Sequence, residues 1–272
     1  MFSKEQISLY DQSLGRVTLV GAGPGDPELI TVRGQRALRE AEVVIYDDLA
    51  NPELLKLCPT ARAIYVGKRA GRHCVPQEET TALLVAEAQA GHHVVRLKGG
   101  DPLMFGRGGE EAHALAAAGI PCEIVPGVTA AIAAGAAAGV PLTHRDHASA
   151  VVFVTGHECA KAETRVDWAA LAKTGATLCI YMGARRLPQI AAALTAGGLR
   201  ESTPVAVVTN ASLPTQEVRV ATLGSAGELA PTILGKPALI IVGEVVRLAE
   251  VLTQASALAV PASGVVELAN VA

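Results

Sequence analysis

Short β-branched runs alternate with segments of helical pattern in the first half of the chain, and this alternation limits the fold more than any other feature. The runs begin at Arg16, Glu42, Ala63, His93 and Cys122. Turn residues bound each run, as expected of buried strands. Parallel strands need long crossover connections, so the helical segments are expected to cover both faces of a mainly parallel sheet. Ligands are then expected at the carboxyl ends of its strands.

A second series of apolar runs follows a polar segment, residues 143–149, and predicts a second α/β domain. These runs begin at Ala150, Thr177, Pro204 and Ala238. From Glu217, apolar and polar residues alternate before a glycine turn, which favours an antiparallel strand and therefore a mixed sheet.

The predicted organisation is an N-terminal α/β domain at 15–142, a linker at 143–149 and a C-terminal α/β domain at 150–252. Residues 1–14 are expected to be an N-terminal extension, and residues 253–272 a tail.

Composition excludes some functions for this chain of 272 residues. Its formal net charge of -3 provides no basic field for nucleic acid or an anionic membrane. Five scattered cysteines lack metal-ligand spacing, so reduced thiols in the cytoplasm are expected. The N-terminus does not resemble a signal peptide. The uncharged stretch between Glu123 and His144 is rich in Ala and Gly, which predicts a buried helix and not a membrane span.

A glycine-rich loop, GAGPGDPELI from Gly21, leaves the first predicted strand. Glycines let the backbone approach a ligand closely. Asp26 and Pro27 suit the N-cap and first position of a helix that is expected to open there. A dinucleotide site is an alternative, because Asp47 and Asp48 follow the second strand. The third fingerprint glycine is replaced by Asp26, however, and a carboxylate there would repel a pyrophosphate.

A second loop, LKGGDPLMFGRGGEEA from Leu97, holds the densest group of candidate residues. Gly99 and Gly100 permit close backbone approach, and Asp101 with the following proline favours a turn. Acidic residues at 110 and 111 fit the start of a helix, whereas Arg107 is electrostatically disfavoured there. The loop is therefore more than a capped turn.

These motifs and several others together resemble a known family. They are VGAGPGDPELIT from Val20, YDDL from Tyr46, VGKRAGRHCVPQEE from Val66, VRLKGGDP from Val95 followed by FGRGGEE, VPGVTAA from Val125, GVPLTHRD from Gly139, VTGH from Val154, YMG from Tyr181 and KPALIIVG from Lys236. The chain resembles the two-domain tetrapyrrole methylases that use S-adenosylmethionine, and among them the uroporphyrinogen-III C-methyltransferases. The GKRAG-HCVPQEE and PLTHRD strings carry the subfamily resemblance.

The resemblance implies a cofactor cleft between two α/β domains and methylation of uroporphyrinogen III at C2 and C7. The product would be precorrin-2, formed through precorrin-1, for sirohaem, cobalamin or haem d1 synthesis, with S-adenosylhomocysteine released. It implies a homodimer, with no metal and no nucleic-acid or membrane partner. Another corrin-ring precorrin C-methyltransferase is the alternative.

The resemblance also implies roles for individual residues. Asp47 would be the proton acceptor and Lys68 the proton donor, with Arg107 a third catalytic residue. The substrate carries eight carboxylates, and its candidate ligands are Arg107, Glu110, Arg145 and His157. The candidate cofactor contacts are Pro24, Gly99, Gly100, Asp101, Met104, Thr129, Ala130, Met182 and Ala211.

From the residues alone, structural roles remain open for several of these positions. Asp47 could be a turn residue at a strand end, and Lys68 a surface cation. His157 could be a turn histidine, and Met182 could fill a core. The HRDH segment from His144 offers two histidines, too few to complete a metal coordination shell.

Overall fold

A parallel sheet with the strand order β3-β2-β4-β1-β5 forms the first half of the structure, a computed structural model that describes residues 14–67, 76–157, 166–250 and 252. Its strand pairs are all parallel. The strands are β1 (Arg16–Gly21), β2 (Val43–Tyr46), β3 (Arg62–Tyr65), β4 (His93–Lys98) and β5 (Cys122–Val125). Each coincides with a predicted run, so the prediction of a parallel first sheet is confirmed.

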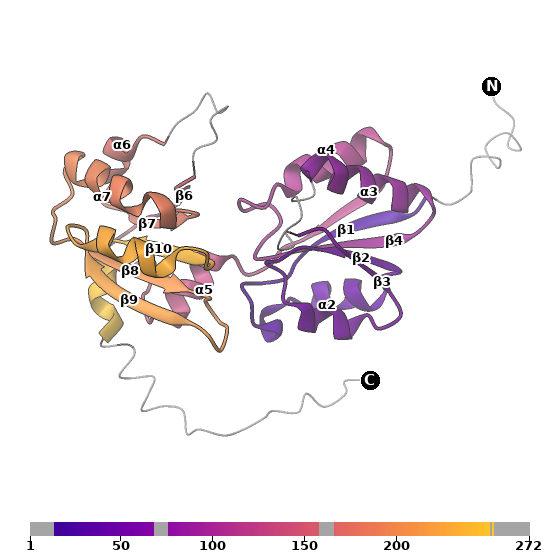
Figure 1. Ribbon diagram of the computed structural model, residues 1–272, viewed down its shortest axis with the longest axis horizontal. Helices are drawn as coiled ribbons and strands as arrows, with labels where there is room; N and C mark the ends of the chain where they lie inside the picture. The colour runs from indigo at the N-terminus through magenta and orange to yellow at the C-terminus, as the bar shows by residue number, and fades with distance from the viewer. Residues whose placement is uncertain (1–13, 68–75, 158–165, 251, 253–272) are drawn as a thin grey trace, which may run out of the picture. The chain divides into compact units, whose positions relative to one another are not determined.

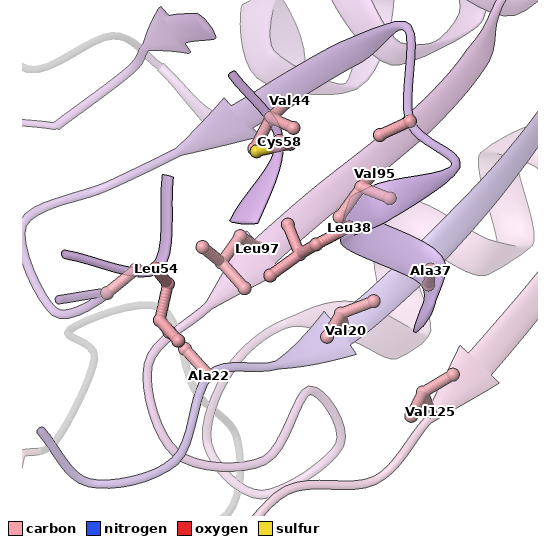
Figure 2. Packing of buried hydrophobic residues seen from close by; sticks show 12 residues of the cluster. Val20, Ala22, Ala37, Leu38, Val44, Leu54, Cys58, Val95, Leu97 and Val125 are labelled. Atoms are coloured by element: carbon pink, nitrogen blue, oxygen red, sulfur yellow. The ribbon is translucent and has the colours of Figure 1, made fainter. Parts of the chain in front are cut away.

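Helices cover both faces of this sheet. Figure 1 shows α2 (Val32–Arg39) on one face and α3 (Gln77–Gln89) with α4 (Gly108–Ala117) on the other. Two hydrophobic layers result, because successive residues of a strand point to opposite faces. Val20, Val95 and Leu97 pack with Leu38 of α2 (Figure 2). Leu19 and Val94 belong to the layer that includes Leu84 of α3 and Leu115 of α4.

The first helix does not open where the sequence predicts it. Residues Pro27–Leu29 form a short 3₁₀ turn, η1, because the Asp26 carboxylate accepts a hydrogen bond from the Glu28 N–H at 2.9 Å. The backbone is then extended at Ile30, and α2 begins at Val32. Thr31 is the N-cap of α2, since its hydroxyl accepts a hydrogen bond from the Gly34 N–H.

The second sheet has the order β6-β7-β10-β8-β9. Its strands are β6 (Val151–Thr155), β7 (Thr177–Tyr181), β8 (Pro204–Thr209), β9 (Glu217–Thr222) and β10 (Ala238–Val242). β6 and β7 are parallel. The Leu223 N–H, just after β9, donates to the carbonyl of Thr203, just before β8, so these consecutive strands are antiparallel. The prediction of a mixed sheet with an antiparallel edge strand is confirmed.

The helices of the second half are short. They are α6 (Trp168–Ala172), α7 (Leu187–Ala196) and α8 (Ala230–Ile233), with 3₁₀ turns at η3 (Ala184–Arg186), η4 (Ala226–Leu229) and η5 (Glu244–Leu248). The 3₁₀ turn η2 (Pro52–Leu57) belongs to the first half, between β2 and β3. The uncharged stretch contains α5 (Ala130–Ala137), where a helix was expected. Within the described ranges, no helix has the length and apolarity needed to cross a membrane.

Contacts divide the described chain into two units. The first contains residues up to 134 together with 209–217 and 235–239, and the second contains the remainder. The connection between β8 and β9 therefore packs with the first sheet's unit, although it follows β8 in the sequence.

Candidate active site at the carboxyl ends of the first sheet

Three loops meet where β1, β4 and β5 end. The Gly23 N–H donates to the Gly100 carbonyl at 3.2 Å, and the Gly100 N–H donates to the Gly23 carbonyl at 2.6 Å. Asp101 joins the third loop, because its Oδ2 accepts a hydrogen bond from the Gly127 N–H at 3.0 Å. The two glycine loops predicted as ligand-facing are thus hydrogen-bonded to each other and to the loop after β5.

Glycine is required at the centre of this junction. A Cβ atom on Gly21 would lie 2.5 Å from the backbone nitrogen of Gly127, and one on Gly127 would overlap the Gly100 carbonyl. Gly23 and Gly100 also adopt φ values of 78° and 67°, which most residues avoid. The loops therefore approach as closely as they do because they lack side chains.

The junction lies at a switch in chain direction. β1 and β4 are adjacent strands, but β1 leads to α2 on one face whereas β4 leads to α4 on the other. In open parallel sheets, loops that diverge in this way leave a crevice beyond the strand ends, where ligands bind. The strand order therefore places the switch point of the first sheet between β1 and β4, where the two glycine loops leave it.

Residues distant in sequence complete the first loop. The Asp26 N–H donates to the Ser212 hydroxyl at 3.0 Å, and a Cβ on Gly25 would lie 3.4 Å from the Ala211 carbonyl oxygen. The Asn51 side-chain amide donates to the Gly25 carbonyl at 2.7 Å. Residues 211–212 and the GPGD loop are consequently parts of one local structure within the first unit.

Most of the predicted cofactor contacts lie in this first unit. A Cβ on Gly100 would lie 3.8 Å from the Thr129 Cα and 3.9 Å from the Ala130 nitrogen. The Met104 N–H donates to the Asp101 carbonyl. Pro24 precedes Gly25 in the first loop, and Ala211 lies beside Gly25. Gly99, in the second loop, packs on Leu49.

Asp47, at the end of β2, lies beside the second glycine loop. Its Oδ1 accepts a hydrogen bond from the Leu49 N–H at 3.2 Å, and a Cβ on Gly99 would overlap Leu49. Its Oδ2 forms an ion pair of 2.6 Å with Arg96 Nη2. The Asp47 side chain retains 27% exposure, so the carboxylate is held by protein on one side and open to solvent on the other.

Asp47 lies at the edge of a charge network that also comprises Arg96, Lys98, Glu111 and Gln77. Glu111 is completely buried and its Oε1 accepts from Arg96 Nε at 3.3 Å and Lys98 Nζ at 3.1 Å. Gln77 Nε2 also donates to this oxygen, at 2.8 Å. Burial, and secondarily the nearby Arg96 charge, lowers the pKa of Lys98.

Arg107 and Glu110 form an ion pair at the start of α4. Arg107 Nε and Nη2 donate to the two carboxylate oxygens of Glu110 at 2.9 and 2.7 Å. This hydrogen bonding raises the pKa of Arg107 and lowers the pKa of Glu110, so both groups stay charged. Arg107 is the N-cap residue and has a left-handed backbone, with φ of 59°. Its side chain is 51% exposed, which suits a surface that meets an anionic ligand.

The remaining described candidates belong to the second unit. His157 and Met182 follow β6 and β7, whose ends meet because a Cβ on Gly156 would lie 2.5 Å from the Gly183 Cα. Met182 is 54% exposed with φ of 54°, so it does not fill a core. Arg145 lies in the turn closed by the His144–Ala148 bridge and is exposed. Lys68 lies outside the described residues.

Neither a metal site nor a dinucleotide site is supported. The described part of the chain contains no group of three or more His, Cys, Asp or Glu side chains that could hold a metal ion. Asp26 places its own carboxylate at the N-terminus of η1. Asp47 is paired with Arg96, and Asp48 accepts a hydrogen bond from the Tyr65 hydroxyl, so neither is poised as a dedicated ribose ligand.

The sequence reasoning missed Arg96, Lys98 and Gln77 as site residues, and interpreted Glu111 only as a favourable charge near a helix start. A signal was present, because two cations on alternate residues of a buried apolar strand need buried partners. Ser212 and Asn51 were also missed, and no sequence pattern marks them.

The chain has two β-sheets covered by helices, and two glycine loops are joined at the carboxyl ends of the first sheet. These features define a class of α/β proteins that bind small ligands beyond the strand ends. The chain belongs to the tetrapyrrole (corrin/porphyrin) methylases, whose family model matches residues 16–227.

Relatives with known names support this membership. The chain is 52% identical over 238 residues to siroheme synthase 2 of Aeromonas hydrophila, a match that covers 87% of this chain and 50% of that one. It is 52% identical over 249 residues to siroheme synthase 1 of Yersinia pseudotuberculosis, covering 89% and 52%. The chain thus spans about half the length of these curated relatives.

Solved structures show the same fold. The uroporphyrin-III C-methyl transferase of Thermus thermophilus, complexed with S-adenyl homocysteine, is 43% identical with a TM-score of 0.74, covering 86% of this chain and all of that one. A cobalamin biosynthetic enzyme, cobalt precorrin-4 methyltransferase, is 31% identical with a TM-score of 0.76, covering 85% and 95%.

Proposed function

We propose that this chain methylates uroporphyrinogen III with S-adenosylmethionine, at C2 and then C7, to give precorrin-2. The observation that carries the proposal is the hydrogen-bonded pair of glycine loops beside Asp47, in a chain 43% identical to a uroporphyrin-III C-methyl transferase across that protein's whole length. A homodimer in the cytoplasm, with precorrin-2 feeding sirohaem, cobalamin or haem d1 synthesis, is part of the same proposal.

The residues of the first unit fit the proposed cofactor. Gly100 has no side chain on the side that faces Thr129 and Ala130, which favours close approach of a ligand to the backbone there. Leu49 and Leu103 are 60% and 58% exposed, and provide apolar surface suited to a nucleoside base. S-adenosylmethionine, when bound, supplies an electrophilic methyl group.

The further proposed contacts are Pro24, Asp101, Met104 and Ala211 in the first unit and Met182 in the second. Asp101 is already engaged by the Gly127 and Leu103 N–H groups, so its side chain shapes the loop and leaves recognition to backbone atoms.

In this proposal the protein mainly holds the two reactants in line and accepts a proton. A pyrrole carbon would take the methyl group as the methyl–sulfur bond of S-adenosylmethionine breaks. S-adenosylhomocysteine would leave with that bond's electron pair, and the ring would become positively charged. Loss of a ring proton restores neutrality, and the exposed side of the Asp47 carboxylate is the acceptor. A carboxylate suffices because the methylated ring is strongly acidic. Lys68 remains the proposed proton donor.

Anion recognition is assigned to Arg107, Arg145 and His157, with Glu110 orienting Arg107. Uroporphyrinogen carries many carboxylates, and arginine can contact two carboxylate oxygens at once. Because Arg107 now donates both bonds to Glu110, a substrate carboxylate would share or displace that partner.

A direct assay tests the substrate. The purified chain should convert uroporphyrinogen III and S-adenosylmethionine, without oxygen, to a product that mass spectrometry shows to carry two added methyl groups. The same fold in a cobalt precorrin-4 methyltransferase makes a later corrin intermediate the main competitor. Methyl transfer to such an intermediate and none to uroporphyrinogen III would contradict the proposal.

The Asp47→Asn variant tests the proton acceptor. We expect turnover to fall by about 10²-fold or more, because an amide does not accept the ring proton. Affinity for S-adenosylhomocysteine, measured by calorimetry, should stay the same because the glycine loops are unchanged. Loss of that affinity would instead assign Asp47 to the cofactor site.

A further inference from the structure

The central strand β4 carries two buried cations, Arg96 and Lys98, on the face covered by α3 and α4. Their side chains are 4% and 5% exposed. Removing a charge from water costs several kcal/mol unless partners compensate it. The buried charges of Arg96 and Lys98 therefore need an anion nearby to compensate them.

Glu111, in the first turn of α4, is the shared partner of both cations. Its Oε1 accepts hydrogen bonds from Arg96, Lys98 and Gln77, whereas its buried Oε2 has no hydrogen-bond partner among the residues that the structure describes. An anion is favoured at a helix N-terminus, which helps to hold this carboxylate in place.

The guanidinium of Arg96 is held on three sides. Its Nε donates to Glu111, and its Nη1 donates to the carbonyls of Leu97 at 3.0 Å and Ile45 at 3.4 Å. Because the guanidinium is planar, these contacts direct Nη2 at Asp47 Oδ2, 2.6 Å away.

Both oxygens of Asp47 are oriented as a result. Oδ2 is held by Arg96, and Oδ1 by the Leu49 N–H in the turn that packs on Gly99. The carboxylate thus has a defined direction relative to the second glycine loop.

We infer that Glu111, together with Lys98, is a positioning residue: it holds the Arg96 guanidinium in the orientation that aims the Asp47 carboxylate at the site. Lys98 balances the charge, so that two cations and the Glu111 carboxylate are buried together, with the partly exposed Asp47 as the second anion. The inference rests on the proposed function for the role of Asp47 as acceptor. Neither Glu111 nor Lys98 is required to touch the substrate.

The test is the Glu111→Gln variant, which keeps the side chain's shape and removes its charge. The turnover number for uroporphyrinogen III should fall about 10- to 100-fold, as expected when a reacting group is misplaced. The KM for S-adenosylmethionine should not change. A crystal structure of the variant should show that Arg96 no longer donates to Asp47.

Combining Glu111→Gln with Asp47→Asn separates positioning from a general structural role. If Glu111 acts through Asp47, the double variant should be no slower than Asp47→Asn alone. Multiplied losses would overturn the inference, as would full turnover in Glu111→Gln. Glu79→Gln, an exposed change in the first turn of α3, is the matched control and should behave as the unmodified chain does.

Two further readouts keep the outcome decisive. If Glu111→Gln does not fold, Gln77→Met takes its place, because this change removes one donor to Glu111. Gln77→Met is then combined with Asp47→Asn, and the turnover of the double variant is compared with that of Asp47→Asn alone. If Asp47→Asn retains full turnover, the acceptor role in the proposed function fails. The Arg96–Asp47 contact in the Glu111→Gln crystal structure still decides the inference, and an unchanged contact refutes it.

Discussion

Arg107 has two features that each destabilise the folded chain. A left-handed backbone costs a non-glycine residue about 1–2 kcal/mol, and Arg107 has φ of 59°. A cation at the start of a helix is also electrostatically unfavourable. Such a residue is expected where function outweighs stability, and its exposed guanidinium is suited to a substrate carboxylate.

Replacing Arg107 by glycine should separate these effects. Arg107→Gly removes the backbone strain, so the melting temperature should not fall, whereas the KM for uroporphyrinogen III should rise about tenfold or more through loss of a charged hydrogen bond. Arg39→Ala, an exposed change at the end of α2, is the control for net charge. An unchanged KM in Arg107→Gly would refute the anchoring role.

Among the elements, the loops after β1, β4 and β5 leave little room for side chains where they meet. Gly21, Gly100 and Gly127 approach one another through backbone atoms, so a side chain on Gly21 or Gly127 would push the loops apart. The glycine loops could be predicted because glycine next to a strand end has few other uses.

Gly127→Ala should disrupt this junction. Its Cβ would overlap the Gly100 carbonyl, so we expect unfolding to become easier by about 1–3 kcal/mol. Affinity for S-adenosylhomocysteine, measured by calorimetry, should fall with it. Gly109→Ala is the matched control, because a Cβ there meets nothing within 4 Å. Cofactor affinity equal in the two variants would argue against the junction as the cofactor site.

The strands could be predicted from sequence because β-branched runs bounded by turns are local signals. The two cations of β4 were visible in the sequence, but their partners could not be predicted, since the network joins residues of β2, β4, α3 and α4 that only the tertiary fold brings together. The same holds for Ser212, which lies far along the chain from its partner Asp26. The prediction that a helix begins at Asp26 and Pro27 was wrong because an Asp N-cap followed by proline also fits the start of a 3₁₀ turn.

At the scale of the molecule, the two units each carry part of the predicted site. The first holds the glycine loops, Asp47 and Arg107, and the second holds Arg145, His157 and Met182. Of the cysteines that the structure describes, Cys58 and Cys179 are buried and Cys122 is partly exposed. The reactivity of these thiols can therefore report whether each unit is folded.

Cys179 should report unfolding of the second unit. Burial in β7 raises the pKa of its thiol to about 12, from 9.0, so the folded state favours the neutral form. The stability that Cys179 contributes is present below pH 9 and is lost as pH rises toward 12. At pH 8, iodoacetamide should modify Cys122 before Cys179, as peptide mass spectrometry would show. Rapid modification of Cys179 in the folded chain would contradict this.

The discontinuity of the first unit also affects the order in which the chain can fold during synthesis. Residues 209–217 and 235–239 belong to that unit, and Ser212 binds the backbone at Asp26. A ribosome adds about 5–20 residues per second, so the sheet that ends with β5 must wait on the order of 5–20 s for its last segments. During that interval the GPGD loop lacks its partner, and the proposed cofactor site on the nascent chain is not yet complete.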